Sequence, residues 1–381
     1  MSLFFSRDTK VFLKQGTNVF EIPVLDGYSF SQGTNTSEVT LNEARESATS
    51  TKSRRSRKMF NDSLAPAEWS FSTYVRPIQS GNDTGDWEDA FNQGRAHAIE
   101  EALWANFVAN NSLSAATATQ ASHWADGVTS ASSSTVIDFT GSEVSELGTF
   151  ELFFQVGTGK TYKISKCCVN EASIEFDIDG IATINWSGFG AQITEGTTQT
   201  ATIYEGITDT SNFIRNRLTS LAITAADSAT FPGASNNGVY NVVLTGGNIT
   251  FTNNITFLTP ETLGKVDKPL GHVTGTRTVS GNFTCYLDSS SDGDSDELFT
   301  SLVAADTLVT NDFTLNFSVG GSSTPNLAIN LPQCHLEIPT HSIEDVISLE
   351  VNFHGLSTSI DPTASGNSAD DLEAKLTYTA A

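Results

Sequence analysis

An internal repeat is the feature that most constrains the fold of this 381-residue chain. Residues 150–157 read FELFFQVG and residues 313–320 read FTLNFSVG, so both follow the pattern FxLxFxVG. Apolar residues at every second position predict a strand with one buried face. A cysteine follows each copy, and from Cys167 and Cys334 onward an ungapped offset of 167 residues aligns the two segments. The chain therefore carries the same strand-rich unit twice.

Further matches occur in the same order along the sequence. LWANFVA at 103–109 parallels LFTSLVA at 298–304, and both have the apolar spacing of a helix. Because an ordered series of matches is the signature of a duplication, we predict two tandem domains, residues 1–208 and residues 209–381.

Each unit also contains a long connection between two predicted strands. GYSFS at 27–31 parallels NITFT at 248–252. The next predicted strands, EWSFSTYV and GNFTCYL, align Trp69 with Phe283. The intervening residues, 31–67 in the first unit and 252–280 in the second, are the predicted long arms.

Runs of antiparallel-type strands with one helix predict an α+β fold that is mainly β. Each unit is expected to form a two-sheet antiparallel sandwich or open barrel with one flanking helix. In the first unit we place that helix from about Asp86 to Asn110, with Asp83 or Thr84 as its cap. An additional segment, 111–146, is rich in Ser, Ala and Thr and is predicted to be a surface loop, with a short helix around His123-Trp124.

Positive charge is concentrated in the first arm. The chain has 20 Lys and Arg against 44 Asp and Glu, a formal charge of −24. The heptapeptide KSRRSRK at 52–58 nevertheless holds five basic residues, and the equivalent place in the second arm has only Lys265 and Lys268. The candidate contact residues are Lys52, Arg54, Arg55, Arg57, Lys58, Lys265 and Lys268.

The acidic balance argues against a protein that binds nucleic acid by neutralising phosphates. The 52–58 segment also lacks the aromatic residues on which single-stranded bases stack. A nucleic-acid-binding module therefore remains only a minor alternative.

No motif indicates catalysis. GTGK at 157–160 lacks phosphate-loop spacing and is predicted to be a hairpin turn. The acidic run at 288–297 fails the calcium-loop pattern, and its last carboxylates suit the start of the second helix. The six histidines and four cysteines show no metal-ligand or nucleophile–base spacing, so we predict no enzyme, cofactor or metal site, and buried reduced cysteines. The chain contains no run of about 20 apolar residues, so no membrane span is predicted.

FNDSLAPAEWSFSTYVRP at 60–77 and NITFLTPETLGKV at 254–266 resemble the tail tube proteins of long-tailed bacteriophages. CCVNEASIEFDIDGIATINWSG at 167–188 is similar to the sheet-forming repeat of the same family. The likeness is greatest to the duplicated kind found in flexible-tailed siphophages. It covers nearly the whole chain and agrees with the repeat.

The resemblance implies a structural virion protein of the tail, assembled in the host cytoplasm. A duplicated subunit is expected to form trimeric rings with pseudo-sixfold symmetry, stacked around an acidic channel through which genome DNA passes during ejection without specific binding. The arms are expected to join one ring to the next, and a solvated, mobile loop tip is the alternative for residues 52–58. Implied partners are further copies of the chain, the tape measure protein inside the tube, and tail terminator and tail tip proteins at its ends. A different β-rich tail ring component, from the baseplate or the tail terminator, is the alternative.

Overall fold

The computed structural model describes most of the chain, and the statements below concern this part of it. The described residues are 4–39, 45–47, 50–52, 57–79, 95–109, 124, 127–140, 147–157, 159–201, 212–226, 231, 238–259, 268–289, 295–304, 312–343, 345–357 and 372–381.

We refer to residues 1–208 as the N-terminal half and to residues 209–381 as the C-terminal half. The N-terminal half contains η1 (Ser6–Asp8), β1 (Thr9–Gln15), β2 (Asn18–Ile22), β3 (Ser29–Val39), β4 (Arg45–Ser47), β5 (Ser50–Lys52), β6 (Lys58–Tyr74), β7 (Pro77–Gln79), β8 (Ala96–Ala98), α1 (Glu101–Val108), β9 (Val128–Ser130), β10 (Ser134–Thr140), β11 (Phe150–Val156), β12 (Lys160–Phe176), β13 (Thr183–Gly190) and β14 (Gln192–Glu195).

The C-terminal half contains η2 (Asn216–Leu218), β15 (Ser220–Ala225), β16 (Val239–Val242), β17 (Leu244–Thr252), β18 (Thr256–Leu258), β19 (Gly271–Val273), β20 (Thr278–Tyr286), α2 (Ser295–Ala304), β21 (Phe313–Val319), β22 (Asn326–Leu336), β23 (Thr340–Ile343), β24 (Ile347–Leu356) and β25 (Leu372–Thr379). The fold is mainly β with antiparallel pairing and two helices among the described residues, as predicted.

The same ladder occurs in both halves. β1 lies between β2 and β11, and β15 lies between β16 and β21 in the same way. Phe150 pairs with Cys167 and Phe313 pairs with Cys334, and each pair is followed by a register shift. The two FxLxFxVG segments thus form equivalent strands, β11 and β21, and each has a register shift at the same place in its ladder.

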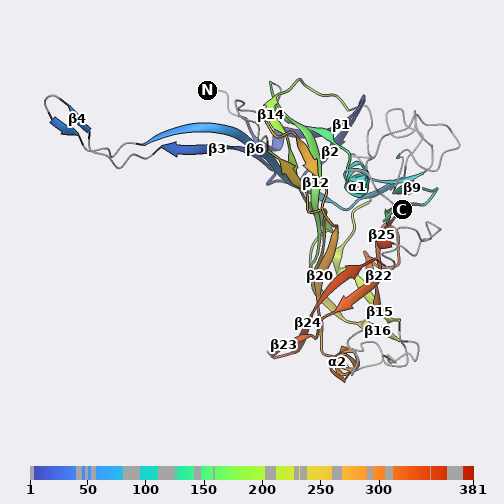
Figure 1. Ribbon diagram of the computed structural model, residues 1–381. Helices are drawn as coiled ribbons and strands as arrows, with labels where there is room; N and C mark the ends of the chain where they lie inside the picture. The colour runs from blue at the N-terminus through green and yellow to red at the C-terminus, as the bar shows by residue number, and fades with distance from the viewer. Residues whose placement is uncertain are drawn as a thin grey trace, which may run out of the picture.

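One sheet runs through both halves in the order β3, β6, β13, β12, β17, β20, β24 (Figure 1). The junction between the halves is the ladder of β12 with β17, from Glu171 opposite Thr252 to Phe176 opposite Gly247. β24 also pairs with β22 and β23. In Figure 1, β3 and β23 lie at opposite ends of this sheet. We call it the long sheet.

The core lies on one side of the long sheet. β13 alternates strictly between buried and partly exposed residues, and the buried set includes Trp186. Trp104 of α1 packs against Trp186 with ring centroids 4.7 Å apart, so the helix covers this face. All four cysteines are buried and free, as predicted. No helix among the described residues is long and apolar enough to cross a membrane.

The first helix is shorter than predicted. It begins at Glu101, because Ala96–Ala98 forms β8, which pairs with β7. The Glu101 carboxylate accepts a hydrogen bond from the Ala98 backbone N–H at 3.3 Å, which helps to fix this start. The predicted start at Asp86 and its caps Asp83 and Thr84 lie outside the described residues.

The prediction of a surface loop at 111–146 is wrong for its described part. Trp124 is buried, and residues 128–130 and 134–140 form β9 and β10. β10 pairs with β25, the last strand of the chain. This pairing covers an edge of β25 that would otherwise be unpaired, which explains why a Ser- and Thr-rich segment forms strands. His123, the centre of the predicted short helix together with Trp124, lies outside the described residues.

The arms also differ from the predicted boundaries. The first arm was predicted to begin at residue 31 and to end at residue 67. Instead, much of this segment is strand, because β3 and β6 stay paired out to Val39 opposite Lys58. The second arm contains the short hairpin of β18 with β19. Cross-strand pairing also corrects the alignment of Trp69. It lies opposite Phe30, and the residue opposite Phe251 is Val279, four positions before the predicted Phe283.

Candidate functional surfaces

The face of the long sheet that points away from the core is polar and continuous across both halves. Residues opposite one another in a ladder share a face, and one such row crosses six strands. This row is Ser72, Asn185, Ser173, Thr250, Ser280 and His354. We call the surface built from such rows the polar face. It comprises Ser29, Ser31, Glu68, Ser70, Ser72, Tyr74, Glu171, Ser173, Glu175, Thr183, Asn185, Ser187, Asn248, Thr250, Thr252, Thr278, Ser280, Asn282, Thr284, His335, Glu337, Ser348, Glu350, Asn352 and His354.

The polar face carries negative charge without compensation by lysine or arginine. None of the residues that make up the polar face is a lysine or an arginine. The carboxylates are Glu68, Glu171, Glu175, Glu337 and Glu350. Because both halves contribute, the charge is spread over the whole width of the sheet.

Asparagine amides hold several of these carboxylates. Asn185 donates to Glu175 at 3.1 Å and Asn282 donates to Glu350 at 2.9 Å. Asn352 donates to Glu337 at 3.0 Å, and His354 lies 3.3 Å from the same carboxylate. These contacts lower the pKa of Glu337. A neutral amide orients a carboxylate without cancelling its charge, so the face remains anionic at neutral pH.

The polar face was not predicted from the sequence. Its signal is present in the strands AEWSFSTY, EASIEF and TINWSGFG, where Ser, Thr, Asn and Glu occupy every second position. The alternation shows that one side of each strand is polar. It does not show that these sides join into one surface, because that depends on which strands are neighbours.

The first arm is a long β-hairpin that extends from the body of the protein (Figure 1). Arg57 donates to Glu38 at 3.1 Å, and Lys58 lies 5.3 Å from the centre of the Phe60 ring. Met59 and Phe60 are about half exposed. The described part of the arm therefore combines basic and exposed apolar side chains.

The predicted contact residues are only partly described. Lys52 is the last residue of β5 in a small hairpin with β4. Arg57 and Lys58 lie at the described end of the β3–β6 ladder. Arg54, Arg55 and Lys265 lie outside the described residues.

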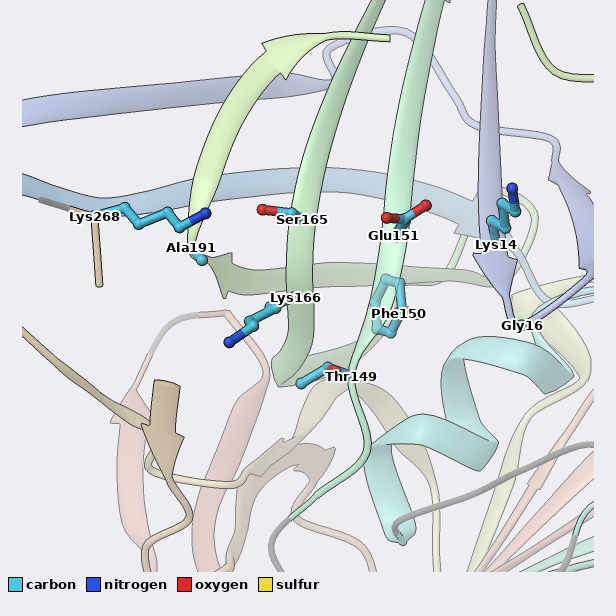
Figure 2. Close-up of a pocket in the computed structure, with 9 residues that line it drawn as sticks. All are labelled: Lys14, Gly16, Thr149, Phe150, Glu151, Ser165, Lys166, Ala191 and Lys268. Atoms are coloured by element: carbon cyan, nitrogen blue, oxygen red, sulfur yellow. The ribbon is translucent and has the colours of Figure 1, made fainter. Parts of the chain in front are cut away.

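Lys268 lies at a pocket of about 530 Å3 near the root of the first arm. Figure 2 shows Lys268 and Lys166 on one side of this pocket, with Lys14 and Glu151 on the other. The sequence placed Lys268 in an arm, but nothing in it connected this residue with Lys14 and Lys166, which come from the other half.

The other motifs considered in the sequence, namely GTGK, the acidic run and the histidines, occupy structural positions. GTGK joins β11 and β12, which pair from Val156 opposite Lys160, so the predicted hairpin is confirmed. α2 begins at Ser295 with Asp296 and Glu297 in its first turn, as predicted for the end of the acidic run. His97 is buried against Glu101 at 3.0 Å. No group of three or more metal-ligating side chains occurs within the described residues.

Comparison with known proteins agrees with these features. The phage tail tube protein family matches residues 28–380. The tail tube protein pb6 of Escherichia phage T5 is 31% identical over 385 residues, which covers 95% of this chain and 74% of that protein. The long antiparallel sheet and the projecting hairpin are thus found in a chain that belongs to the phage tail tube protein family, whose members are structural subunits of the virion tail.

Proposed function

We propose that three copies of this chain close into a ring with pseudo-sixfold symmetry, built from six similar halves, and that the rings stack into a tube whose channel is lined by the polar face. Genome DNA would pass through this channel during ejection. The observation that carries the proposal is the ladder between β12 and β17, which joins the two halves within one chain.

This junction has a counterpart at the two ends of the long sheet. β3 in the N-terminal half pairs with β6 as β17 pairs with β20, and β23 pairs with β24 as the end of β12 pairs with β13. Among the described strands, β3 has no other ladder partner than β6, and β23 has none other than β24. Open edges of this kind favour pairing with another chain. Each copy therefore offers one edge of each kind.

The repeat gives the register of the proposed junction between chains. Within the chain, Ser173 lies opposite Thr250. Ser173 also lies opposite Asn185, whose counterpart at the 167-residue offset is Asn352 on β24. Because Thr340 lies opposite Glu350, the residue at the level of Asn352 is Ile338, just before β23. Moving Thr250 back by the 221-residue offset gives Ser29 on β3. We therefore expect Ile338 of one copy opposite Ser29 of the next. Three such junctions would close the sheet on itself and remove its open edges.

Closure would place the polar face on the inside of the ring. Five carboxylates per chain would give fifteen per ring of three copies. DNA carries about one negative charge per 1.7 Å of its axis, so a surface without lysine or arginine repels it from all sides. This lining suits passage of DNA without retention.

Disulfide cross-linking tests the register. Ser29 and Ile338 are both exposed, and the four native cysteines are buried. Oxidation of the Ser29→Cys/Ile338→Cys variant should give a covalent trimer that persists on non-reducing gels. The matched control is Ser29→Cys/Thr340→Cys, which is two residues out of register. Equal cross-linking in the control would contradict the register, and a covalent hexamer would contradict the trimeric ring.

We propose that the basic arm residues, with Lys265 and Lys268, contact the adjacent ring. Support comes from the projecting hairpin and from the attraction between a basic arm and a chain of net charge −24. Tape measure, terminator and tail tip proteins are expected partners on the basis of the family alone.

A further inference from the structure

Two exposed turns lie at the end of the long sheet opposite the arms. β6 pairs with β13 from Ala67 opposite Gly190, where the arm leaves, to Tyr74 opposite Thr183. The turn before Thr183 is therefore at the far end. In the C-terminal half, the turn between β23 and β24 occupies the same end, because Tyr286 pairs with Ser348 there.

Both turns combine exposed apolar and acidic residues. Residues 177–181 read DIDGI, with Ile178 46% exposed, and residues 343–347 read IEDVI, with Ile343 80% exposed. Asp177 and Asp345 are exposed too. Arg217 lies 3.7 Å from Asp179, but both side chains are more than three-quarters exposed, so this pair neutralises little of the charge. Exposed aliphatic residues beside carboxylates, repeated in both halves, indicate a contact surface.

The pocket of Lys14, Lys166 and Lys268 lies at the other end of the same sheet. Ala191 lines it and directly follows Gly190, the last residue of β13 at the arm end. The lining carries three lysines against a single carboxylate, and that carboxylate, Glu151, is paired with Lys163. The pocket is thus a basic recess on a strongly acidic chain.

We propose that this lysine pocket receives an acidic turn of a second copy of the chain in the next ring. The inference rests on the proposed tube. Stacking with all rings in the same direction brings the arm end of one copy against the turn end of the next, a contact that does not close and therefore propagates. The carboxylates would face the lysines, and the exposed isoleucine would lose its contact with water.

The pairing explains why opposite charges are separated along the axis of the sheet. Two copies that meet arm end to arm end would bring lysines together, and two that meet turn end to turn end would bring carboxylates together. Only the head-to-tail arrangement is attractive. The two surfaces would thus set the polarity of the tube as well as holding the rings together.

Charge reversal in both surfaces tests the proposal. A turn variant, Asp177→Lys/Asp345→Lys, and a pocket variant, Lys14→Glu/Lys268→Glu, should each form rings but need at least about tenfold more protein to form tubes. A chain with all four changes should recover, because attraction is restored with inverted sign. Comparison of Asp177→Lys with Asp345→Lys would show which turn enters the pocket.

Arg7→Glu/Lys10→Glu is the matched control, with two reversals on exposed side chains at the other end of β1. It should assemble like the unchanged chain. Ring size is measured by mass photometry and tube length by electron microscopy, with circular dichroism to confirm folding. Tube formation by the turn or pocket variant at the unchanged concentration would overturn the inference, as would failure of the fourfold variant to recover. If the unchanged chain forms no rings, the proposed function itself fails.

Discussion

The two halves share a sheet but differ in how their helices are covered. All eight residues of α1 are buried, whereas Val303 of α2 is 55% exposed. α1 is covered by β10 and β25, which have no counterpart over α2 among the described strands. Because β25 belongs to the C-terminal half, the covering layer also ties the two halves together.

The difference is clearest at the start of each helix. The sequence repeat aligns Glu100 with Ser295, and both are fully buried. The Ser295 hydroxyl donates to the Tyr286 carbonyl at 2.7 Å and accepts from the Asp288 N–H at 2.8 Å. Burial instead raises the pKa of Glu100 to about 8, and nearby Tyr378 and Arg76 offset only part of this increase. The sheet was thus kept in both halves while the outer layer diverged.

Replacement of the equivalent core aromatics should have the largest effect. Trp186→Ala and Phe353→Ala are each expected to lower the free energy of unfolding by about 3–5 kcal/mol, since both side chains are buried. Trp186→Ala should cost more, because its indole N–H also donates to Thr73 at 3.0 Å. Urea unfolding measures both. An equal or smaller effect of Trp186→Ala would contradict the larger contribution assigned to Trp186.

The buried carboxyl should make stability depend on pH. In the unfolded chain Glu100 loses its proton near pH 4.5, but in the folded chain only near pH 8. The folded state therefore holds the extra proton between these values, and stability falls as pH rises, by about 3 kcal/mol from pH 5 to 8. Glu100→Gln should flatten this dependence. Ser295→Ala should lower stability by a similar amount at each pH, and a pH profile unchanged by Glu100→Gln would contradict the assignment.

A smaller loss is expected from breaking a hydrogen bond between the halves. The Trp104 indole N–H donates to the Tyr378 hydroxyl at 2.7 Å in the buried layer. Tyr378→Phe leaves this donor without its partner and should cost about 1–3 kcal/mol. Hydrogen exchange of β10 amides should increase along with the drop in the urea midpoint. Unchanged exchange in β10 would mean that β25 does not depend on this bond.

The arm should contribute least to the stability of a single chain. Arg57 and Glu38 form an exposed pair, which is worth about 0.2–1 kcal/mol. Replacement of Lys52, Arg54, Arg55, Arg57 and Lys58 by Ser should leave the thermal midpoint of the unassembled chain nearly unchanged. The same variant should need more protein or less salt to form tubes. If it assembles like the unchanged chain, the basic arm does not contact the next ring.

Local patterns identified a large part of the fold. Alternation in FELFFQVG and FTLNFSVG located β11 and β21, and the glycine-containing GTGK located the turn after β11. These features depend on residues close in sequence. The strands β9 and β10 were missed because their apolar pattern is short. β9 pairs only with β10 among the described strands, and the other partner of β10 is β25, which lies more than 200 residues away.

The candidate surfaces also divide into those that local sequence reveals and those that depend on which strands are neighbours. The sequence identified the basic arm and Lys268, because charge can be read without knowing neighbours. It did not reveal the polar face or the pocket, since both depend on which strands lie side by side. Lys14, Lys166 and Lys268 belong to three separate segments and come together only around the folded end of the sheet.

The repeated unit, the strand alternation and the charge imbalance can all be read from the sequence, because none of them depends on which strands are neighbours in the fold. The tertiary structure decided the register of the ladders, the junction of β12 with β17, and the separation of acidic turns from the lysine pocket. Alternation shows that a strand has an apolar face, but it does not specify the partner of that strand, because many strands in the chain show the same alternation. Only the joint packing of all strands selects which two edges meet and which two stay open.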